Sequence, residues 1–151
     1  MNPYLLPSIE FGPVVVQRLL ERIPATYLDL ATEEGRFTPR EVIAHLADWE
    51  PIMRERIVTG RAHPGARIEA YDEGEMAVAN GYAKSDPEAQ CALFLHERKI
   101  TAKLLRELTA EEWKRTVVHP ERGVLTLEDL ANLLLGHDLY HIEQLSASLS
   151  E

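Results

Sequence analysis

The stretch TLEDLANLLLGHDLYHIEQL, residues 126–145, carries the clearest structural signal in the chain. Thr126 precedes Asp129 by three residues, which is typical of a helix start, because the hydroxyl can accept a bond from the later amide. Apolar or histidine side chains then recur every three or four residues, as they do on one face of a helix. They are Leu127, Leu130, Leu134, His137, His141 and Leu145. The pattern predicts a long helix that runs from here to the C-terminus.

Three more segments have helical spacing. A helix is expected over residues 13–23, with a proline in its first turn and another just beyond its end. Thr38 and Glu41 form a capping box that starts a second helix, which runs to about Thr59. Another start at residues 85–88, Ser-Asp-Pro-Glu, predicts a third helix. One side of it carries Ala89, Leu93, Ile100, Leu104 and Leu108.

Longer connections separate these helices, at residues 24–37, 60–84 and 109–125. The middle one is expected to hold a short helix around Glu73 to Asn80. The last one begins with another capping box, but its Pro and Gly leave room for little more than a turn of helix before a loop. No stretch alternates in the way of a strand, so the sequence predicts an all-α four-helix bundle.

Composition restricts the function classes. A length of 151 residues predicts one domain, over residues 1–151. The 16 Lys and Arg against 25 Asp and Glu give a net charge of −9, which disfavours nucleic acid and anionic membranes as partners. The lone Cys91 cannot form an intramolecular disulfide, and the N-terminus does not resemble a signal peptide. We therefore expect a cytoplasmic protein without a membrane span.

Two histidines interrupt the leucine face of the last helix. His137 and His141 are four residues apart, so their imidazoles project from one side. Burying both rings requires partners for four nitrogens, and a metal ion would satisfy two of them at once. His45 occupies a similar inward position on the helix at 38–59, and by itself it would be read as an ordinary core histidine. Together the three residues predict a metal site formed by two helices.

The same histidines bear on topology. His45 lies about 10 Å along its helix, whereas the His137 and His141 pair lies about 20 Å from the start of its own helix and about 15 Å from the end. Antiparallel helices align these positions better than parallel ones do. The long 60–84 connection could cross the bundle, so we favour an up-down-down-up arrangement over simple up-down-up-down connectivity.

Three neutral imidazoles suit Zn, Ni, Fe or Mn as a divalent ion, and spacing alone does not choose among them. They leave the charge of the ion uncompensated and at least one position open. A bound water would become more acidic, or a thiol would be deprotonated. The sequence therefore favours a catalytic form of site, for hydrolysis or thiol transfer of a small-molecule substrate.

Other side chains are candidates for supporting roles. Asp48, three residues after the first of these histidines, could accept a bond from an imidazole, act as a base or bind metal, or be a solvated carboxylate. Trp49 and Tyr140 could border a substrate pocket, although such an aromatic is more often a core residue. His119 and Arg122, in the loop before the last helix, could contact an anionic group or stabilise the turn.

The two segments TPREVIAHLADWEPIMRERI (38–57) and HPERGVLTLEDLANLLLGHDLYHIEQL (119–145) resemble the DinB-like superfamily of candidate metalloenzymes. The resemblance runs from about residue 14 to residue 149. It implies a four-helix bundle with up-down-down-up topology, frequent homodimers, and activities that include metal-dependent transfer of low-molecular-weight thiols and related isomerase chemistry. It also implies that a divalent metal is bound by one histidine of the second long helix and the pair on the last, here His45, His137 and His141.

Three functions remain open from sequence. The first is a metal-dependent enzyme, either a hydrolase or a thiol S-transferase that uses a low-molecular-weight thiol as cofactor. The second is a non-catalytic metal-binding or stress-associated homodimer, in which the ion only ties two helices together. The third is a metal-free module that binds a small molecule in its polar cavity.

Overall fold

Four long helices make up most of the described chain, which comprises residues 1–149 of the computed structural model. They are α1 (Leu5–Leu20), α2 (Pro39–Ala62), α4 (Pro87–Arg106) and α5 (Leu127–Ser146). The connections contain the short helix α3 (Glu73–Ala79), the strands β1 (Ala66–Arg67), β2 (Thr116–His119) and β3 (Gly123–Thr126), and 3-10 turns at Ala25–Tyr27, Tyr82–Lys84 and Glu112–Lys114.

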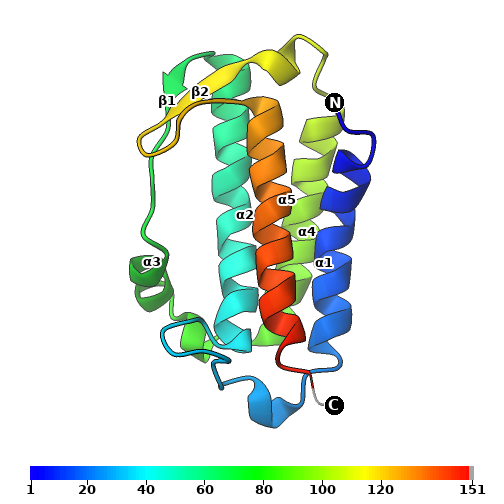
Figure 1. The fold of residues 1–151 in the computed structure, drawn as a ribbon, viewed down its shortest axis with the longest axis vertical. Helices are drawn as coiled ribbons and strands as arrows, with labels where there is room; N and C mark the ends of the chain where they lie inside the picture. The colour runs from blue at the N-terminus through cyan, green and yellow to red at the C-terminus, as the bar shows by residue number, and fades with distance from the viewer. Residues whose placement is uncertain (150–151) are drawn as a thin grey trace.

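The long helices form the predicted up-down-down-up bundle. In Figure 1, α1 and α5 run down the page while α2 and α4 run up it. Both α1 and α2 pack against α4 and α5. The connection from α2 to α4 extends along the outside of the bundle and carries β1 and α3 (Figure 1). Helices α2 and α5, which carry the three histidines, are therefore antiparallel neighbours.

Three predicted helix starts are confirmed by the hydrogen bonds that cap them. The Glu41 amide donates to the Thr38 hydroxyl at 3.3 Å, and the Thr38 amide donates to the Glu41 carboxylate at 2.8 Å. Thr126 and Asp129 exchange the same pair of bonds at the start of α5, at 3.0 and 2.8 Å. The Asp86 carboxylate accepts from amides of the first turn of α4. Each cap satisfies amides that lack a partner within the helix.

The predicted start of the first helix, at Pro13, is wrong. Helix α1 begins at Leu5, and Pro13 lies buried in its middle. A proline inside a helix leaves the carbonyl four residues earlier without its usual donor. Here that carbonyl belongs to Ile9, and it accepts a bond from Arg98 Nη1 of α4 at 2.6 Å. A long-range contact therefore replaces the missing bond and allows the helix to continue through the proline.

The predicted four-helix-bundle class is confirmed, but the expectation that the chain has no strands is wrong, because a small sheet closes one end of the bundle. β1 pairs in parallel with β2, with Ala66 opposite Val117, and β2 pairs antiparallel with β3, with Val117 opposite Leu125. Strands of two and four residues are too short for alternation to stand out in the sequence. A Cβ atom at Gly60 would lie 2.8 Å from the Val117 side chain and 2.7 Å from that of Leu127, so this glycine lets the sheet approach α2 closely.

The two shorter helical predictions have different outcomes. The helix expected around Glu73 is present as α3, capped by Asp72. The capping box of Thr109 and Glu112 forms, with bonds of 3.2 and 2.9 Å, but it opens only a 3-10 turn before β2. A cap alone does not propagate a helix when the following residues enter a strand.

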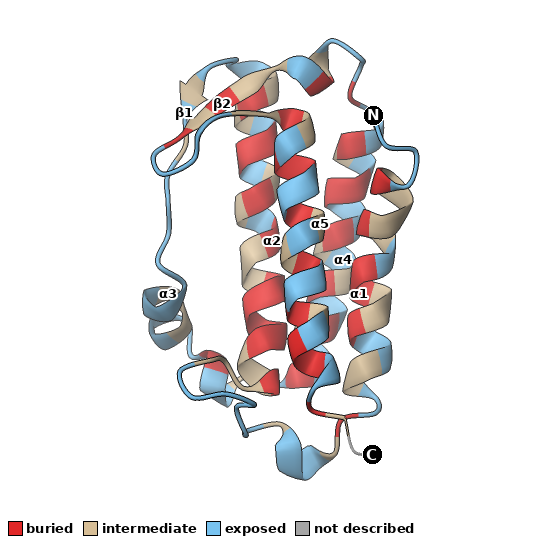
Figure 2. Ribbon diagram, viewed as in Figure 1, coloured by how far each residue is buried: buried red, intermediate tan, exposed pale blue. Residues whose placement is uncertain are grey.

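Buried residues recur along the four long helices and in the segments that connect them, as the colours of Figure 2 show. They form two apolar clusters along the bundle. The cluster nearer the sheet consists of Leu5, Ile9, Met53, Ile57, Leu105, Leu108, Trp113, Val117, Leu127, Leu130, Ala131 and Leu134. The other consists of Val16, Ile23, Val42, Ile43, Leu46, Ala47, Cys91, Phe94 and Leu145. No helix in residues 1–149 is long and apolar enough to cross a membrane.

A buried ion-pair network lies among the long helices. Arg98 of α4 pairs with Glu50 of α2 at 2.7 and 2.8 Å and with Asp138 of α5 at 2.5 and 2.9 Å. With the bond to the Ile9 carbonyl of α1, the five N–H donors of this guanidinium have five acceptors. Burial alone would lower the pKa of Arg98, but the two carboxylates outweigh it and raise it. One side chain therefore bonds to all three of the other long helices.

Replacing Arg98 should destabilise the fold severely. In Arg98→Met two carboxylates stay buried without a cation, and removing one partner of a buried pair costs about 3–5 kcal/mol. Urea denaturation at neutral pH should show this loss in the free energy of unfolding. The control is Arg106→Met, which removes an exposed ion pair with Glu10 from the same helix and should change stability far less. Equal losses in both variants would contradict the structural role of the network.

Candidate metal centre

The structure brings His45, His137 and His141 together. Each offers one ring nitrogen, and these three atoms all lie within 4.8 Å of one another. The Nε2 atoms of His45 and His137 are 2.9 Å apart, and the three ring centroids are separated by 4.7 to 4.9 Å. Antiparallel packing of α2 on α5 makes this possible, because the N-terminal part of α2 meets the C-terminal half of α5.

Neighbouring groups orient two of the rings. His141 Nδ1 lies 3.0 Å from Gln144 Oε1, and Gln144 Nε2 donates to the Phe37 carbonyl at 2.9 Å. The amide of Gln144 is thereby fixed with its oxygen toward the ring, so His141 Nδ1 carries the proton and Nε2 has the free lone pair. His45 is fully buried, and its ring lies 5.5 Å from that of Phe37 and 5.5 Å from that of Trp49. Sequence reasoning missed Gln144, whose position three residues after His141 on the same helix face was the available signal.

Burial keeps these histidines neutral. It lowers the pKa of His45 to about 3, helped by the neighbouring His141. It lowers the pKa of His137 to about 2, with further contributions from His141 and His45. For His141 burial again dominates and lowers the pKa to about 4, although the bond to Gln144 opposes it. A neutral imidazole is the form that binds a metal.

The donor set fits a divalent metal. Two Nε2 atoms 2.9 Å apart can both bind one ion at the roughly 2.0–2.1 Å usual for zinc and imidazole. Three neutral ligands from two helices would leave at least one coordination position for a further ligand.

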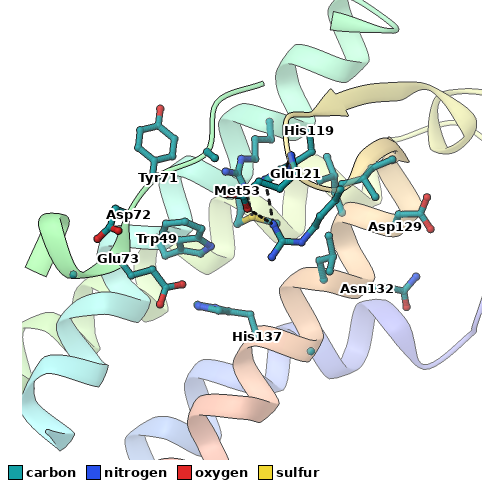
Figure 3. Close-up of a pocket in the computed structure, with 18 residues that line it drawn as sticks. Trp49, Met53, Tyr71, Asp72, Glu73, His119, Glu121, Asp129, Asn132 and His137 are labelled. Atoms are coloured by element: carbon teal, nitrogen blue, oxygen red, sulfur yellow. Dashed lines mark hydrogen bonds and ion pairs between the residues drawn. The ribbon is translucent and has the colours of Figure 1, made fainter. Parts of the chain in front are cut away.

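Glu73, the first residue of α3, is a group that sequence reasoning did not identify. Its Oε1 atom lies 3.8 Å from His45 Nε2. Figure 3 shows the Glu73 carboxylate and the His137 ring pointing toward each other. Burial, together with Asp72, raises the pKa of Glu73 above its ordinary value. The residue comes from a connection with no regular spacing relative to the histidines, so no sequence pattern could associate them.

A cavity of about 910 Å³ opens beside this cluster (Figure 3). Its walls come from α2, the segment leading into α3, the β2–β3 hairpin and α5. His137 and Glu73 line one part of it. Three of the residues predicted as pocket or loop contacts, Trp49, His119 and Arg122, also line it.

Two predicted site residues lie elsewhere. Asp48 does not contact the histidines; its carboxylate accepts bonds from Asn80 Nδ2 at 2.7 Å and from the Tyr82 hydroxyl at 2.6 Å. The Asp48 side chain lines a separate groove between α2 and α4. The residue of this part of α2 that packs on the ring of His45 is Trp49. Tyr140 is exposed, and although its ring lies 5.1 Å from that of His141, it does not line the cavity.

The fold and this cluster can now be compared with known proteins. A sequence model of the DinB superfamily matches residues 9–145. The chain belongs to the DinB superfamily. The match spans α2 and α5 and therefore includes the three clustered histidines.

Two relatives carry the name "Putative metal-dependent hydrolase". YfiT of Bacillus subtilis is 27% identical over 139 residues, which cover 91% of this chain and 78% of YfiT. OB0782 of Oceanobacillus iheyensis is 28% identical over 140 residues, which cover 93% of this chain and 81% of that protein. The similarity in both cases extends across nearly the whole chain.

Solved structures agree on the fold. The structure of B. subtilis YfiT, described as having an unusual four-helix bundle topology, superposes with a TM-score of 0.90 at 26% identity and covers 95% of this chain and 83% of its own. A mycothiol-dependent maleylpyruvate isomerase superposes with a TM-score of 0.75 at 15% identity, over 93% of this chain and 59% of the isomerase. At this identity, the similarity to the isomerase shows a shared fold alone.

The buried histidines should make metal-free protein less stable in mild acid. Their pKa values are lowered on folding, so below about pH 6.5 the unfolded chain binds protons that the folded chain does not. Stability is therefore complete above that pH and falls as the pH drops toward the folded values of about 2 to 4, by up to about 1.4 kcal/mol per pH unit for each histidine. Urea denaturation of metal-free protein between pH 7 and pH 5 measures the slope.

His137→Gln should make this slope shallower, because one of the titrating rings is removed. The matched control is His96→Gln, which changes an exposed histidine of α4 and should leave the slope as it is. A slope that is the same in wild type and His137→Gln would show that His137 does not take part.

Proposed function

We propose that this protein is a metal-dependent hydrolase whose divalent ion is held by His45, His137 and His141. The convergence of three neutral imidazoles, two of them buried and His137 half-buried beside a cavity, is the observation that supports this function most strongly. Membership of the DinB superfamily and the names of the two relatives agree with it. Zn, Ni, Fe and Mn all suit such ligands.

The ion would act as a Lewis acid and lower the pKa of water toward neutrality. Around it, residues of the chain would handle protons and exclude solvent. Hydrolysis adds a hydroxyl to the electrophilic carbon and a proton to the leaving group. Glu73 is suited to take the proton from water and to pass it to the leaving group, since Oε1 lies 3.8 Å from His45 Nε2 and its raised pKa makes the carboxylate a better base. Trp49 would shield the centre on the α2 side.

A cavity against the histidines favours catalysis over a purely structural ion. Structural metal sites have all their positions filled by protein ligands, whereas catalytic sites keep one open. Here the protein supplies three imidazoles, and His137 lines the cavity. An ion that only joined α2 to α5 would need no adjoining space of about 910 Å³.

A thiol S-transferase is the second candidate. A bound ion would deprotonate a thiol as it would water. The only cysteine of the chain, Cys91, is buried in the apolar core and lines no part of the cavity, so the thiol would be a low-molecular-weight cofactor. The isomerase that shares the fold is named as mycothiol-dependent. Adding a small thiol to the assays below separates the two reactions.

Assembly and location follow from the family resemblance and from composition. We propose a cytoplasmic homodimer that acts on a small molecule and does not bind nucleic acid. Size-exclusion chromatography with light scattering tests the dimer.

Metal content is the most direct test of the centre. Protein purified without affinity metal or chelator, or metal-free protein exposed to Zn²⁺, Ni²⁺ or Mn²⁺, should contain about one ion per chain by elemental analysis. His45→Gln and His137→Gln should lose most of it, because each removes one of three ligands. The exposed His63→Gln is the control and should retain the ion. Absence of metal uptake by the wild type would refute the proposal.

Glu73→Gln should separate proton transfer from metal binding. We expect it to retain the ion while the rate of 4-nitrophenyl ester hydrolysis by the metal-loaded protein falls by about 10²-fold, since general bases contribute 10²–10⁴. Glu75→Gln, which changes an exposed acid of the same short helix, is the control. Unchanged hydrolysis in Glu73→Gln would exclude this role, and loss of metal would make Glu73 a ligand instead.

A further inference from the structure

Arg56 is a buried cation whose charge no carboxylate balances. Only 8% of the residue is exposed, and none of the ion pairs found within residues 1–149 includes it. Nη2 donates to the Glu69 carbonyl at 2.7 Å, and Nη1 lies 3.5 Å from the sulfur of Met53. Nε is buried and has no partner in the described part of the chain.

The contrast with Arg98 shows how unusual this is. Both guanidiniums are buried, but Arg98 has an acceptor for each of its five donors, including two carboxylates. A buried charge without a counterion is unfavourable. Burial, and then the nearby Arg122, lower the pKa of Arg56, while Tyr71 opposes them. A bound anion would remove this penalty.

Arg56 lines the same cavity as His137, and Trp49 lies next to both. Its guanidinium carbon is 5.4 Å from the centroid of the Trp49 ring. That ring lies 5.5 Å from the ring of His45 and 5.9 Å from that of His137. The indole therefore neighbours both the cation and the candidate metal ligands, so a small molecule lying along Trp49 can reach both.

His119 and Arg122 of the β2–β3 hairpin add donors to this end of the cavity. The Glu121 amide donates to His119 Nδ1 at 3.1 Å, which places the proton of a neutral ring on Nε2. That nitrogen is 3.3 Å from Arg122 Nη1, so two donors face each other. After burial, the charges of Arg56 and Arg122 are the main causes that lower the pKa of His119, which keeps it neutral. An acceptor between these groups would satisfy both.

The remaining charges of the cavity favour a single negative charge on the ligand. Asp72 and Asp129 also line it, and both are engaged in capping helices. Glu121 lies 3.7 Å from Arg122 and partly balances it. With Glu73 beside the histidines, these acids would repel a doubly charged phosphate more than a carboxylate.

We propose that Arg56, assisted by His119 and Arg122, binds a carboxylate of the substrate. The substrate is then a small carboxylic acid that lies along Trp49 and presents its reacting bond to the histidine cluster. Calling the bound acid a substrate rests on the proposed function, but the anion subsite itself requires no metal. A planar carboxylate suits the fork of a guanidinium.

The test uses metal-free protein and two probes of the same shape, benzoate and benzamide. Binding is followed by NMR of the Trp49 indole N–H, assigned with a Trp113→Phe variant. We expect benzoate to bind at least about tenfold more tightly than benzamide, because hydrogen bonds to a charged acceptor are stronger than those to a neutral amide. Arg56→Gln should remove this preference and Arg56→Lys should keep part of it. Arg54→Gln, which removes the ion pair with Glu97 at residues that do not line the cavity, is the control.

Equal affinities for benzoate and benzamide in the wild type would overturn the proposal. This result does not depend on whether a variant folds. Retention of the preference in a folded Arg56→Gln, checked by circular dichroism, would overturn it as well. The two proposals fail separately. If the protein binds benzoate through Arg56 but takes up no metal, the hydrolase proposal is refuted and the anion subsite stands. If it takes up metal but shows no preference for benzoate, the anion subsite is refuted and the hydrolase proposal stands.

Discussion

The pairing of one buried guanidinium with two carboxylates constrains most of this structure. Arg98 reaches from α4 to side chains of α2 and α5 and to a backbone carbonyl of α1. Its bonds are directional, so they restrict the axial register of all four helices, whereas apolar contacts tolerate sliding. Gly12 of α1 leaves room for this network, because a Cβ atom at this position would collide with the Asp138 side chain.

This register also positions the candidate metal centre. Asp138 is adjacent to His137 in sequence, and Glu50 lies five residues after His45, so the ion pairs that align α2 with α5 also hold the histidines at a common level. A metal centre needs its ligands held within a few tenths of an ångström. The chain provides this from rigid helices, while Gln144 and the aromatic rings of Phe37 and Trp49 set the ring orientations.

The two long connections supply the chemistry around the centre. Glu73 comes from the connection between α2 and α4, whereas His119 and Arg122 come from the one between α4 and α5. The helices thus present neutral nitrogens and one unpaired cation, and the connections present acids and further donors. This division agrees with the general tendency of loops to vary function on a constant scaffold. Differences in these two segments would change the lining of the cavity while leaving the candidate metal ligands in place.

The sequence by itself determined the elements whose causes are local. Capping residues and apolar spacing predicted α2, α4 and α5, and the histidine pair predicted a polar cluster on α5, because these signals act within a few residues. The start of α1 depended on a bond between Ile9 and Arg98, which are 89 residues apart. Short strands, the carboxylate of Glu73 beside His45, and the unpaired charge of Arg56 likewise exist only through contacts between distant segments. Only the tertiary structure decided these, because burial and pairing of charges depend on which segments meet in space and not on the spacing along the chain.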